Sequence, residues 1–342
     1  MNEYGPNSYS PMFHHIYIEK KAYDYPLTQK LLHQDYFQSK PAIEIDHYKD
    51  VFNRSNQRFH EQKQAPSLIL AVKEGSFVYP GAPVCQSFGN EHFYYTSCIM
   101  NCIYDCEYCY LQGMYPSANL VVFVNLDDIF AEVHTLLQKH PVYLCISYDT
   151  DLLALEPMLG VVHAWMDFVE REPKLTVELR TKSANLASIL DQKPNERFLL
   201  AWTISPESIV QTYEHQAPSF QARLKNIHTA MELGYPVRLC FDPMLSVPDW
   251  KEQYQELVET LAKAIDFTKL TDISLGVFRI SSDYMSTMRK QRPDSAIIQY
   301  PYENDHGVCH IETAKSKKMI RWMSELLSHH ISNEKIFLWE ET

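Results

Sequence analysis

The sequence predicts a parallel α/β fold in which six strand–helix units form an open or partial barrel. Six short apolar runs rich in β-forming residues recur along the chain, and amphipathic helical patterns lie between them. Six units are too few for a closed eight-stranded barrel, so a partial (β/α)6 TIM-like barrel fits better. The predicted strands are HFYYTS (92–97), VYLCIS (142–147), LTVELRT (175–181), FLLAWTIS (198–205), VRLCFDP (237–243) and DISLGVF (272–278).

Two segments between these runs have clear helical patterns. Residues 127–140, DDIFAEVHTLLQKH, place apolar side chains on one face and carry acidic residues at the start and a lysine near the end. Residues 219–234, SFQARLKNIHTAMELG, have Ser219 where a cap is expected and Gly234 where the helix should stop. Both segments are therefore predicted helices.

We expect three regions along the chain. Residues 1–90 are polar and rich in His, Gln and Tyr, with two short apolar runs, HIYIEKKAYDY and SLILAV, and are interpreted as an N-terminal extension packed on the core. Residues 91–280 contain the predicted barrel. Residues 281–342 form an appended C-terminal region, in which a substrate-binding hairpin and a helix are expected.

The composition bounds the class of protein. No run of 18 apolar residues is present, so no membrane span is expected, and the N-terminus lacks the pattern of a secretory signal. The eight cysteines are then expected to be reduced thiols in the cytoplasm. The formal charge of −12 gives no general support for binding nucleic acid, which needs local Lys and Arg.

Four of the eight cysteines lie in one stretch, CIMNCIYDCEYCYLQG (98–113), directly after the first predicted strand. A structural zinc site normally uses two separated ligand pairs, and no second pair follows, although zinc stays open as an alternative. Cys102, Cys106 and Cys109 have the spacing C-x3-C-x2-C, and soft thiolates on a compact loop suit an iron–sulfur cluster. Three ligands would leave one iron of a 4Fe-4S cluster free to bind a small molecule.

CIYDCEYCY resembles the signature of the radical S-adenosylmethionine (radical SAM) enzymes, whose core is a partial barrel of six units. The chain is similar, more narrowly, to the spore photoproduct lyase family. The resemblance implies a 4Fe-4S cluster, S-adenosyl-L-methionine as cofactor, and repair of a thymine photolesion in DNA through a 5′-deoxyadenosyl radical. The resemblance to this family rests on five segments: CEYCYLQ, IYIEKKAYDYPLTQKL near the start, VFVNLDDI, RTKSANL and GYPVRLCFDPMLSVPDW.

The resemblance also implies catalytic roles. Cys145, at the end of the second strand, would donate hydrogen to the product radical, and Tyr108 and Tyr110 would relay hydrogen back. Cys85 is a competing donor, since a cysteine upstream of the cluster takes this role in some relatives. A small core residue is the alternative for Cys145.

Binding roles follow in the same way. Cys102, Cys106 and Cys109 would ligate the cluster, whereas Cys98 is a fourth nearby thiol that the pattern does not require. Lys182 would pair with the carboxylate of S-adenosylmethionine. The resemblance is extended to Ser147 and Ser205, at strand ends, as cofactor contacts, although a strand-end serine is often only a turn residue.

The C-terminal region, where the substrate contact is expected, differs from the family pattern. Members of the family have a basic C-terminal hairpin, whereas residues 297–312, IIQYPYENDHGVCHIE, contain no Arg or Lys. Basic residues occur nearby, in MRKQRP (288–293) and AKSKK (314–318). A radical SAM enzyme acting on a substrate other than duplex DNA, and a non-catalytic metal-binding module, therefore stay open. The chemistry also requires an electron donor, such as flavodoxin or ferredoxin.

Overall fold

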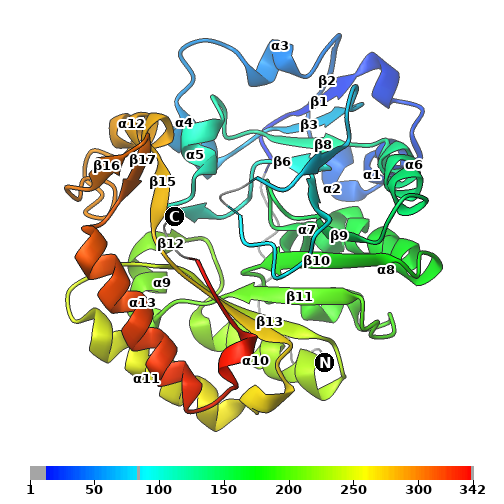
Figure 1. Cartoon of the computed structure of the whole chain (residues 1–342). Coiled ribbons are helices and arrows are strands. Elements are labelled where there is room, and N and C mark those ends of the chain that lie inside the picture. The colour runs from blue at the N-terminus through cyan, green and yellow to red at the C-terminus, as the bar shows by residue number, and fades with distance from the viewer. Residues whose placement is uncertain (1–12, 83–84, 340–342) are drawn as a thin grey trace, which may run out of the picture.

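The computed structural model describes residues 13–82 and 85–339; residues 1–12 of the expected extension and 340–342 of the C-terminal region lie outside them. Its main feature is an eight-stranded sheet with the order β18-β14-β13-β11-β10-β9-β5-β4 (Figure 1). The strands are β4 (Val78–Pro80), β5 (Phe93–Thr96), β9 (Val142–Cys145), β10 (Leu175–Thr181), β11 (Phe198–Thr203), β13 (Val237–Met244), β14 (Asp272–Val277) and β18 (Ile336–Leu338).

The six predicted strands are confirmed, and they stand side by side in chain order as β5, β9, β10, β11, β13 and β14. They are parallel, as continuous apolar runs require, and β11 and β14 are buried along their whole length. β18 adds a parallel edge, and β4 an antiparallel one. In the described part of the chain this sheet stays open, so the fold is a mixed α/β fold with parallel sheets.

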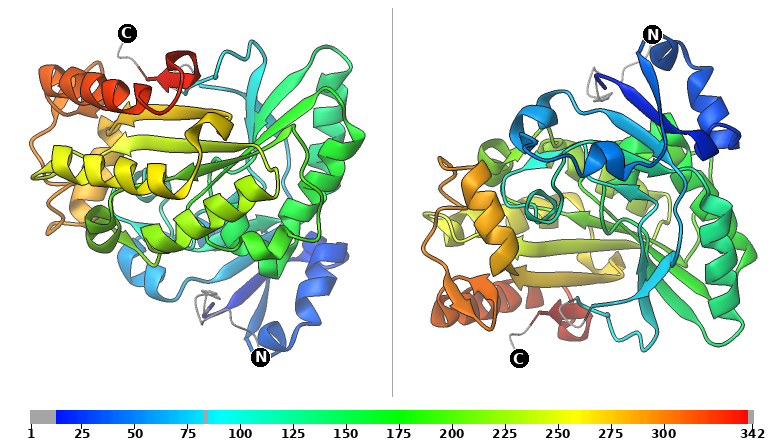
Figure 2. Two further views of the ribbon diagram at one scale, coloured as in Figure 1. Left: turned by 90° about the horizontal axis from the view of Figure 1, so that it is seen from below. Right: turned by 90° about the horizontal axis from the view of Figure 1, so that it is seen from above.

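Helices cover the outer face of this sheet. Both helical predictions are confirmed, as α6 (Leu126–Leu137) and α10 (Phe220–Glu232). Ser219 caps α10 by accepting a bond of 3.2 Å from the Ala222 N–H, and Gly234 follows the helix with a φ of +88°. Figure 2 shows α11 (Trp250–Ala264) between α10 and α13 (Thr313–Ser328).

A second sheet was not predicted. It has five strands in the order β2-β1-β3-β8-β6, with β1 and β3 formed by the two apolar runs of the N-terminal region. Those runs are too short to indicate a sheet alone, but β8 pairs with β3 after the cysteine loop and completes it. The boundary at residue 90 stays a prediction. The strands are β1 (Ile16–Glu19), β2 (Ala42–Ile45), β3 (Leu68–Ala71), β6 (Ile99–Met100) and β8 (Leu120–Phe123).

The C-terminal region contains a hairpin, β16 (Glu303–Asp305) and β17 (Val308–His310), which pairs with β15 (Arg279–Ser281). Helix α12 (Ser282–Gln291) packs against α5 (Leu111–Met114) at the end of the cysteine loop (Figure 1). Their approach requires glycine at position 113, because a Cβ there would lie 2.6 Å from the Tyr284 Cα.

The remaining elements are short, except α8. No single helix in the described residues is long and apolar enough to cross a membrane; α7 and α8 meet that test only as a pair bent by 100°. These elements are α1 (Pro26–Leu32), α2 (Asp35–Gln38), α3 (Lys49–Phe52), α4 (Phe59–Gln64), α7 (Leu152–Leu159), α8 (Val161–Arg171), α9 (Glu207–Tyr213), β7 (Asp105–Cys106), β12 (Glu214–His215), and the 3-10 turns Lys20–Ala22, Leu186–Ile189, Phe267–Lys269 and Asn333–Lys335.

Candidate active site

The cysteine loop lies between the two sheets, after β5 and before α5. Cys106 sits in β7, which pairs with β12 so that Cys106 faces Glu214 in register. Cys102, Cys106 and Cys109 are free thiols, and Cys109 interacts electrostatically with the other two. The structure therefore places the three predicted ligands on one loop, with Cys106 buried and Cys102 and Cys109 half-buried.

Three cations hold this loop. Lys63 Nζ donates to the Tyr104 carbonyl at 2.9 Å and to the Cys102 carbonyl. Arg292 Nε donates to Gln112 Oε1 at 2.6 Å, and its Nη2 donates to Asp105. The third cation, the half-buried Lys182, approaches the loop from the end of β10.

Burial raises the pKa of the Cys102 and Cys106 thiols to about 12, and it also raises the pKa of Cys109. The ammonium groups of Lys63 and Lys182 act in the opposite direction, because positive charge favours the thiolate. A cluster bound by thiolates would gain from the same two charges. The donor set and its cations thus fit an iron–sulfur cluster.

The three thiols do not surround a single point, as the ligands of one metal ion would. Among residues 13–82 and 85–339, no three Cys, His, Asp or Glu side chains are placed to hold a single metal ion. Each cysteine of a cluster binds a different iron, which spreads the ligands apart. Cys98 points elsewhere, because its buried thiol contacts Trp165 on α8.

A buried ionic network lies beside the loop. Lys182 Nζ is 2.7 Å from the Tyr108 hydroxyl, 3.0 Å from Glu214 Oε1 and 3.5 Å from Cys106 Sγ. Glu214 also accepts from Arg223 Nη2 and from the Tyr108 hydroxyl. Burial alone would raise the pKa of Glu214, but Arg223 and Lys182 hold it well below its usual range. Glu214 is therefore a buried carboxylate that forms ion pairs with two cations, the buried Arg223 and the half-buried Lys182.

The two serines have partners within the protein. Ser205 Oγ donates to Glu214 Oε1 at 3.1 Å, and Ser147 Oγ accepts from the Arg180 N–H at 2.7 Å. Ser205 thus joins the network beside the cluster loop, whereas Ser147 links neighbouring strands. Contacts of Lys182, Ser147 and Ser205 with a cofactor stay predictions.

The two hydrogen-donor candidates lie close together. Cys145 ends β9, and burial raises the pKa of its thiol to about 12. Burial also raises the pKa of Cys85, and both thiols interact electrostatically with Arg180 and with each other. Each cysteine therefore keeps its S–H bond at neutral pH.

Tyr108 and Tyr110 are also fully protonated phenols, because burial raises the pKa of each well above its usual value. They point to different groups: the Tyr108 hydroxyl donates to Glu214, and the Tyr110 hydroxyl donates to the Tyr148 carbonyl. Tyr108 therefore belongs with the cluster network, and Tyr110 lies toward the region of Cys85.

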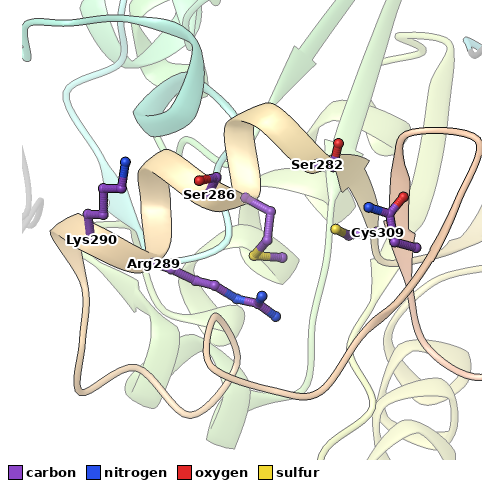
Figure 3. A pocket seen from close by; sticks show the side chains of 7 residues that line it. Ser282, Ser286, Arg289, Lys290 and Cys309 are labelled. Atoms are coloured by element: carbon purple, nitrogen blue, oxygen red, sulfur yellow. The ribbon is translucent and has the colours of Figure 1, made fainter.

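A separate pocket lies on α12 beside the hairpin (Figure 3). Arg289 donates to the Ile298 and Tyr300 carbonyls at 3.2 and 3.0 Å, which anchors the loop before the hairpin. Lys290 is exposed, and Asn304 comes from the facing strand β16. The pocket is lined by Ser282, Met285, Ser286, Arg289, Lys290, Asn304 and Cys309.

Sequence reasoning missed Glu214, Arg223 and Tyr148. Arg223 could have been noticed, because it falls between Phe220 and Ile227 on the buried stripe of α10, where a charge needs a partner. Glu214 had no such signal, since its contacts with Tyr108 and Lys182 are with residues far away in the chain. Tyr148 follows Cys145 by three residues, but neighbouring strands decide what its side chain meets.

An open parallel sheet with three free thiols on the loop after its first core strand, and with the buried Cys145 at the end of β9, fits the site of a radical SAM enzyme. The spore photoproduct lyase family model matches residues 10–299. The chain therefore belongs to the spore photoproduct lyase family, and it is an enzyme.

Individual relatives agree with this assignment. The chain is 26% identical to a spore photoproduct lyase from Clostridium acetobutylicum over 82% of its length and 81% of the relative's. It is 21% identical to one from a Geobacillus strain, over 90% and 86%. A solved spore photoproduct lyase in complex with dinucleoside spore photoproduct has the same fold, with a TM-score of 0.82, 18% identity, and 97% and 100% of the two chains covered.

Proposed function

We propose that this chain reverts the spore photoproduct, 5-thyminyl-5,6-dihydrothymine, to two thymines in DNA. The observation that carries the proposal is the placement of Cys145, a buried and protonated thiol at the carboxyl end of β9, in a family member whose three candidate cluster cysteines lie on one loop. When bound, the 4Fe-4S cluster and S-adenosylmethionine supply a 5′-deoxyadenosyl radical. The protein's part is to position substrate and donors.

Each candidate residue has a role in this proposal. Cys102, Cys106 and Cys109 hold the cluster, and Cys145 gives its hydrogen atom to the product thymine radical. Tyr110 belongs to the return path for hydrogen, and so does Tyr108. A deeply buried thiol and two buried phenols suit these roles, because each keeps a transferable hydrogen atom at neutral pH.

Cofactor contacts are assigned to Lys182, Ser147 and Ser205. All three lie at the carboxyl ends of strands, where ligands bind in parallel α/β sheets. That order of strands and helices also supports the partial (β/α)6 barrel of the radical SAM type. Because each side chain already has a protein partner, a bound cofactor would share or replace that contact.

A second candidate is the same radical chemistry on a substrate other than duplex DNA. The hairpin favours it, since Glu303 and Asp305 are exposed there and would repel phosphates. Against it, Lys290 and Arg289 lie next to the hairpin and could contact a DNA backbone in its place. Duplex DNA is therefore the first candidate substrate.

The test uses enzyme reconstituted with iron and sulfide without oxygen, chemically reduced, and supplied with S-adenosylmethionine. The synthetic lesion is offered as a dinucleotide and within a duplex, and thymidylyl-thymidine is measured. Repair of both is expected. Repair of neither, with 5′-deoxyadenosine still formed, would move the assignment to the second candidate.

The role of Cys145 is tested with the same substrates. Cys145→Ala should divert the product radical into adducts, so that clean repair is lost while cleavage of the cofactor continues. Cys98→Ala is the matched control, because Cys98 is an equally protonated thiol that faces α8 instead. Clean repair by Cys145→Ala would transfer the donor role to Cys85.

The cellular setting is also part of the proposal. All eight cysteines are free thiols, which supports a cytoplasmic location. The electron for the cluster would come from a small reductant such as flavodoxin or ferredoxin. Reduction of the reconstituted cluster by either protein, followed in its absorption spectrum, tests that assignment.

A further inference from the structure

Arg180 lies on the face of the sheet that also carries the proposed hydrogen donor. Glu178 is opposite Cys145 in register, and alternate residues of a strand share a face, so Arg180 follows on the same face. The main-chain N–H of Arg180 donates to Ser147 Oγ at 2.7 Å, two residues beyond Cys145. The Arg180 side chain is 31% exposed, so a ligand that lies beside Cys145 can reach its guanidinium group.

Two arginines on this face use their guanidinium groups differently. Arg238 is buried and donates to the Tyr143 hydroxyl and to Asp272 Oδ2, each at 2.8 Å. It also forms an ion pair with Glu178. Arg180 Nε lies 3.3 Å from Glu178 Oε1, but in the part of the chain that the structure describes this buried nitrogen has no hydrogen-bond partner. Because buried donors are normally paired, Arg238 has a structural role, whereas Arg180 has donors left for a ligand.

Asp242 on β13 and Arg279 at the start of β15 lie next to Arg180. Asp242 Oδ2 is 4.0 Å from Arg180 Nη1, which is too far for a hydrogen bond. Asp242 Oδ1 accepts from Arg279 Nη1 at 3.3 Å, and the Arg279 guanidinium stacks on Trp339, with its carbon 3.5 Å from the ring centroid. This pair requires glycine at position 276, because a Cβ there would lie 2.7 Å from Asp242 Oδ1. A carboxylate can accept about four hydrogen bonds, so Asp242 has lone pairs left for a ligand.

The charges of this cluster are balanced. Three guanidinium groups stand beside three carboxylates: Arg180, Arg238, Arg279, Glu178, Asp242 and Asp272. A phosphate binds where positive charge is in excess, and this cluster has none. A neutral ligand that both donates and accepts hydrogen bonds fits it better.

We propose that Arg180, Asp242 and Arg279 form the site that recognises a thymine base of the lesion. Thymine is neutral, and its edge carries the N3–H group between two carbonyl groups. Asp242 accepts the N3–H, Arg180 donates to the neighbouring carbonyl oxygen, and Arg279 holds the carboxylate in place. Cytosine is excluded, because its unprotonated N3 would face the carboxylate. The inference deepens the proposed function and rests on it, since the bound base would lie beside Cys145.

The test measures binding of the lesion by calorimetry, with the enzyme reconstituted with its cluster and S-adenosylmethionine but not reduced. The ligands are the dinucleotide lesion and the dinucleoside lesion, which lacks the phosphate. Arg180→Gln and Asp242→Ala should each weaken binding of both ligands about tenfold, equal to about 1.4 kcal/mol. Methylation of N3 in both bases should weaken binding to the wild type by a similar factor. It should have little further effect on Asp242→Ala, which already lacks the acceptor.

Arg171→Gln, on the outer helix α8, is the control and should bind both ligands as the wild type does. Arg180→Gln keeps the test valid if Asp242→Ala fails to fold. Equal affinities of Arg180→Gln and the wild type would overturn the inference. A loss confined to the dinucleotide would also overturn it, because the cluster would then bind the phosphate.

Repair by the reduced wild-type enzyme is measured beside binding. A wild type that binds the lesion with the expected losses in the variants, but does not repair it, would contradict the proposed function and leave the base site standing. A wild type that repairs the lesion while both variants bind it unchanged would contradict the base site alone. No binding by the wild type would overturn the base site as well.

Discussion

The cysteine loop and the C-terminal hairpin flank α12, but they are built differently. The loop is buried and is held by the cations Lys63, Lys182 and Arg292. The hairpin is exposed over Glu303–Asp305 and carries carboxylates. The difference indicates that the loop proposed to bind the cluster is tightly constrained, whereas the hairpin proposed to meet the substrate is free to vary in charge.

The strongest test of this comparison removes one thiol from each region. Cys106→Ala should abolish cluster binding and all repair, because three ligands are needed to hold the cluster. Cys309→Ala, in the hairpin, should leave both intact. The two cysteines are equally buried, at 6% exposure, so a difference reflects position and not burial. Iron content after reconstitution and thymidylyl-thymidine formation are the measurements.

The next test concerns the ionic network. Glu214→Gln leaves Arg223 and Lys182 as buried cations without their carboxylate, and this should cost about 3–5 kcal/mol of unfolding free energy. Glu303→Gln in the exposed hairpin should change it by less than about 0.5 kcal/mol. Urea unfolding of the two variants measures both values. Equal midpoints would mean that the network is not a structural support of the loop.

The two regions also differ in how far the sequence predicts them. The proposed cluster ligands can be predicted from the sequence because their spacing is local, and the six core strands can be predicted because each is a continuous apolar run. The role of Glu214 cannot be predicted from the sequence, since Tyr108 and Lys182, which contact it, lie 106 and 32 residues away in the chain. Such contacts exist only after the strands have assembled.

The second sheet illustrates the same limit. β1 and β3 are four residues each, and alone they look like isolated apolar runs in a polar segment. The other partner of β3, β8, lies beyond the cysteine loop, so this pairing joins segments that are far apart in the sequence. Non-local pairing of short strands leaves little trace in a single sequence.

A smaller effect is expected from a charge change at Lys290, beside the hairpin. Lys290→Glu should weaken repair of the lesion in a duplex through a higher KM, with repair of the dinucleotide unchanged, because only the duplex extends to the α12 pocket. The salt dependence of duplex binding should lose about 0.9 in slope, the value of one phosphate contact. Glu303→Lys should act in the opposite direction. Equal effects on dinucleotide and duplex would place Lys290 outside the DNA contact.

The weakest of the predicted effects concerns a partly exposed ion pair outside both regions, and it provides a baseline for the other variants. His163 on α8 bonds Glu156 and, at 2.9 Å, Asp191. Burial lowers the pKa of His163, but these two carboxylates raise it above 6.5 overall. The pairing therefore stabilises the fold fully at a pH below the unfolded-state pKa of 6.5. This stabilisation disappears as the pH rises through the higher pKa of the folded state. His163→Gln should cost under about 1 kcal/mol at pH 6 and less at pH 9, measured by urea unfolding. A loss of unfolding free energy that grows with pH would show that the neutral imidazole ring, and not the ion pair, stabilises α8.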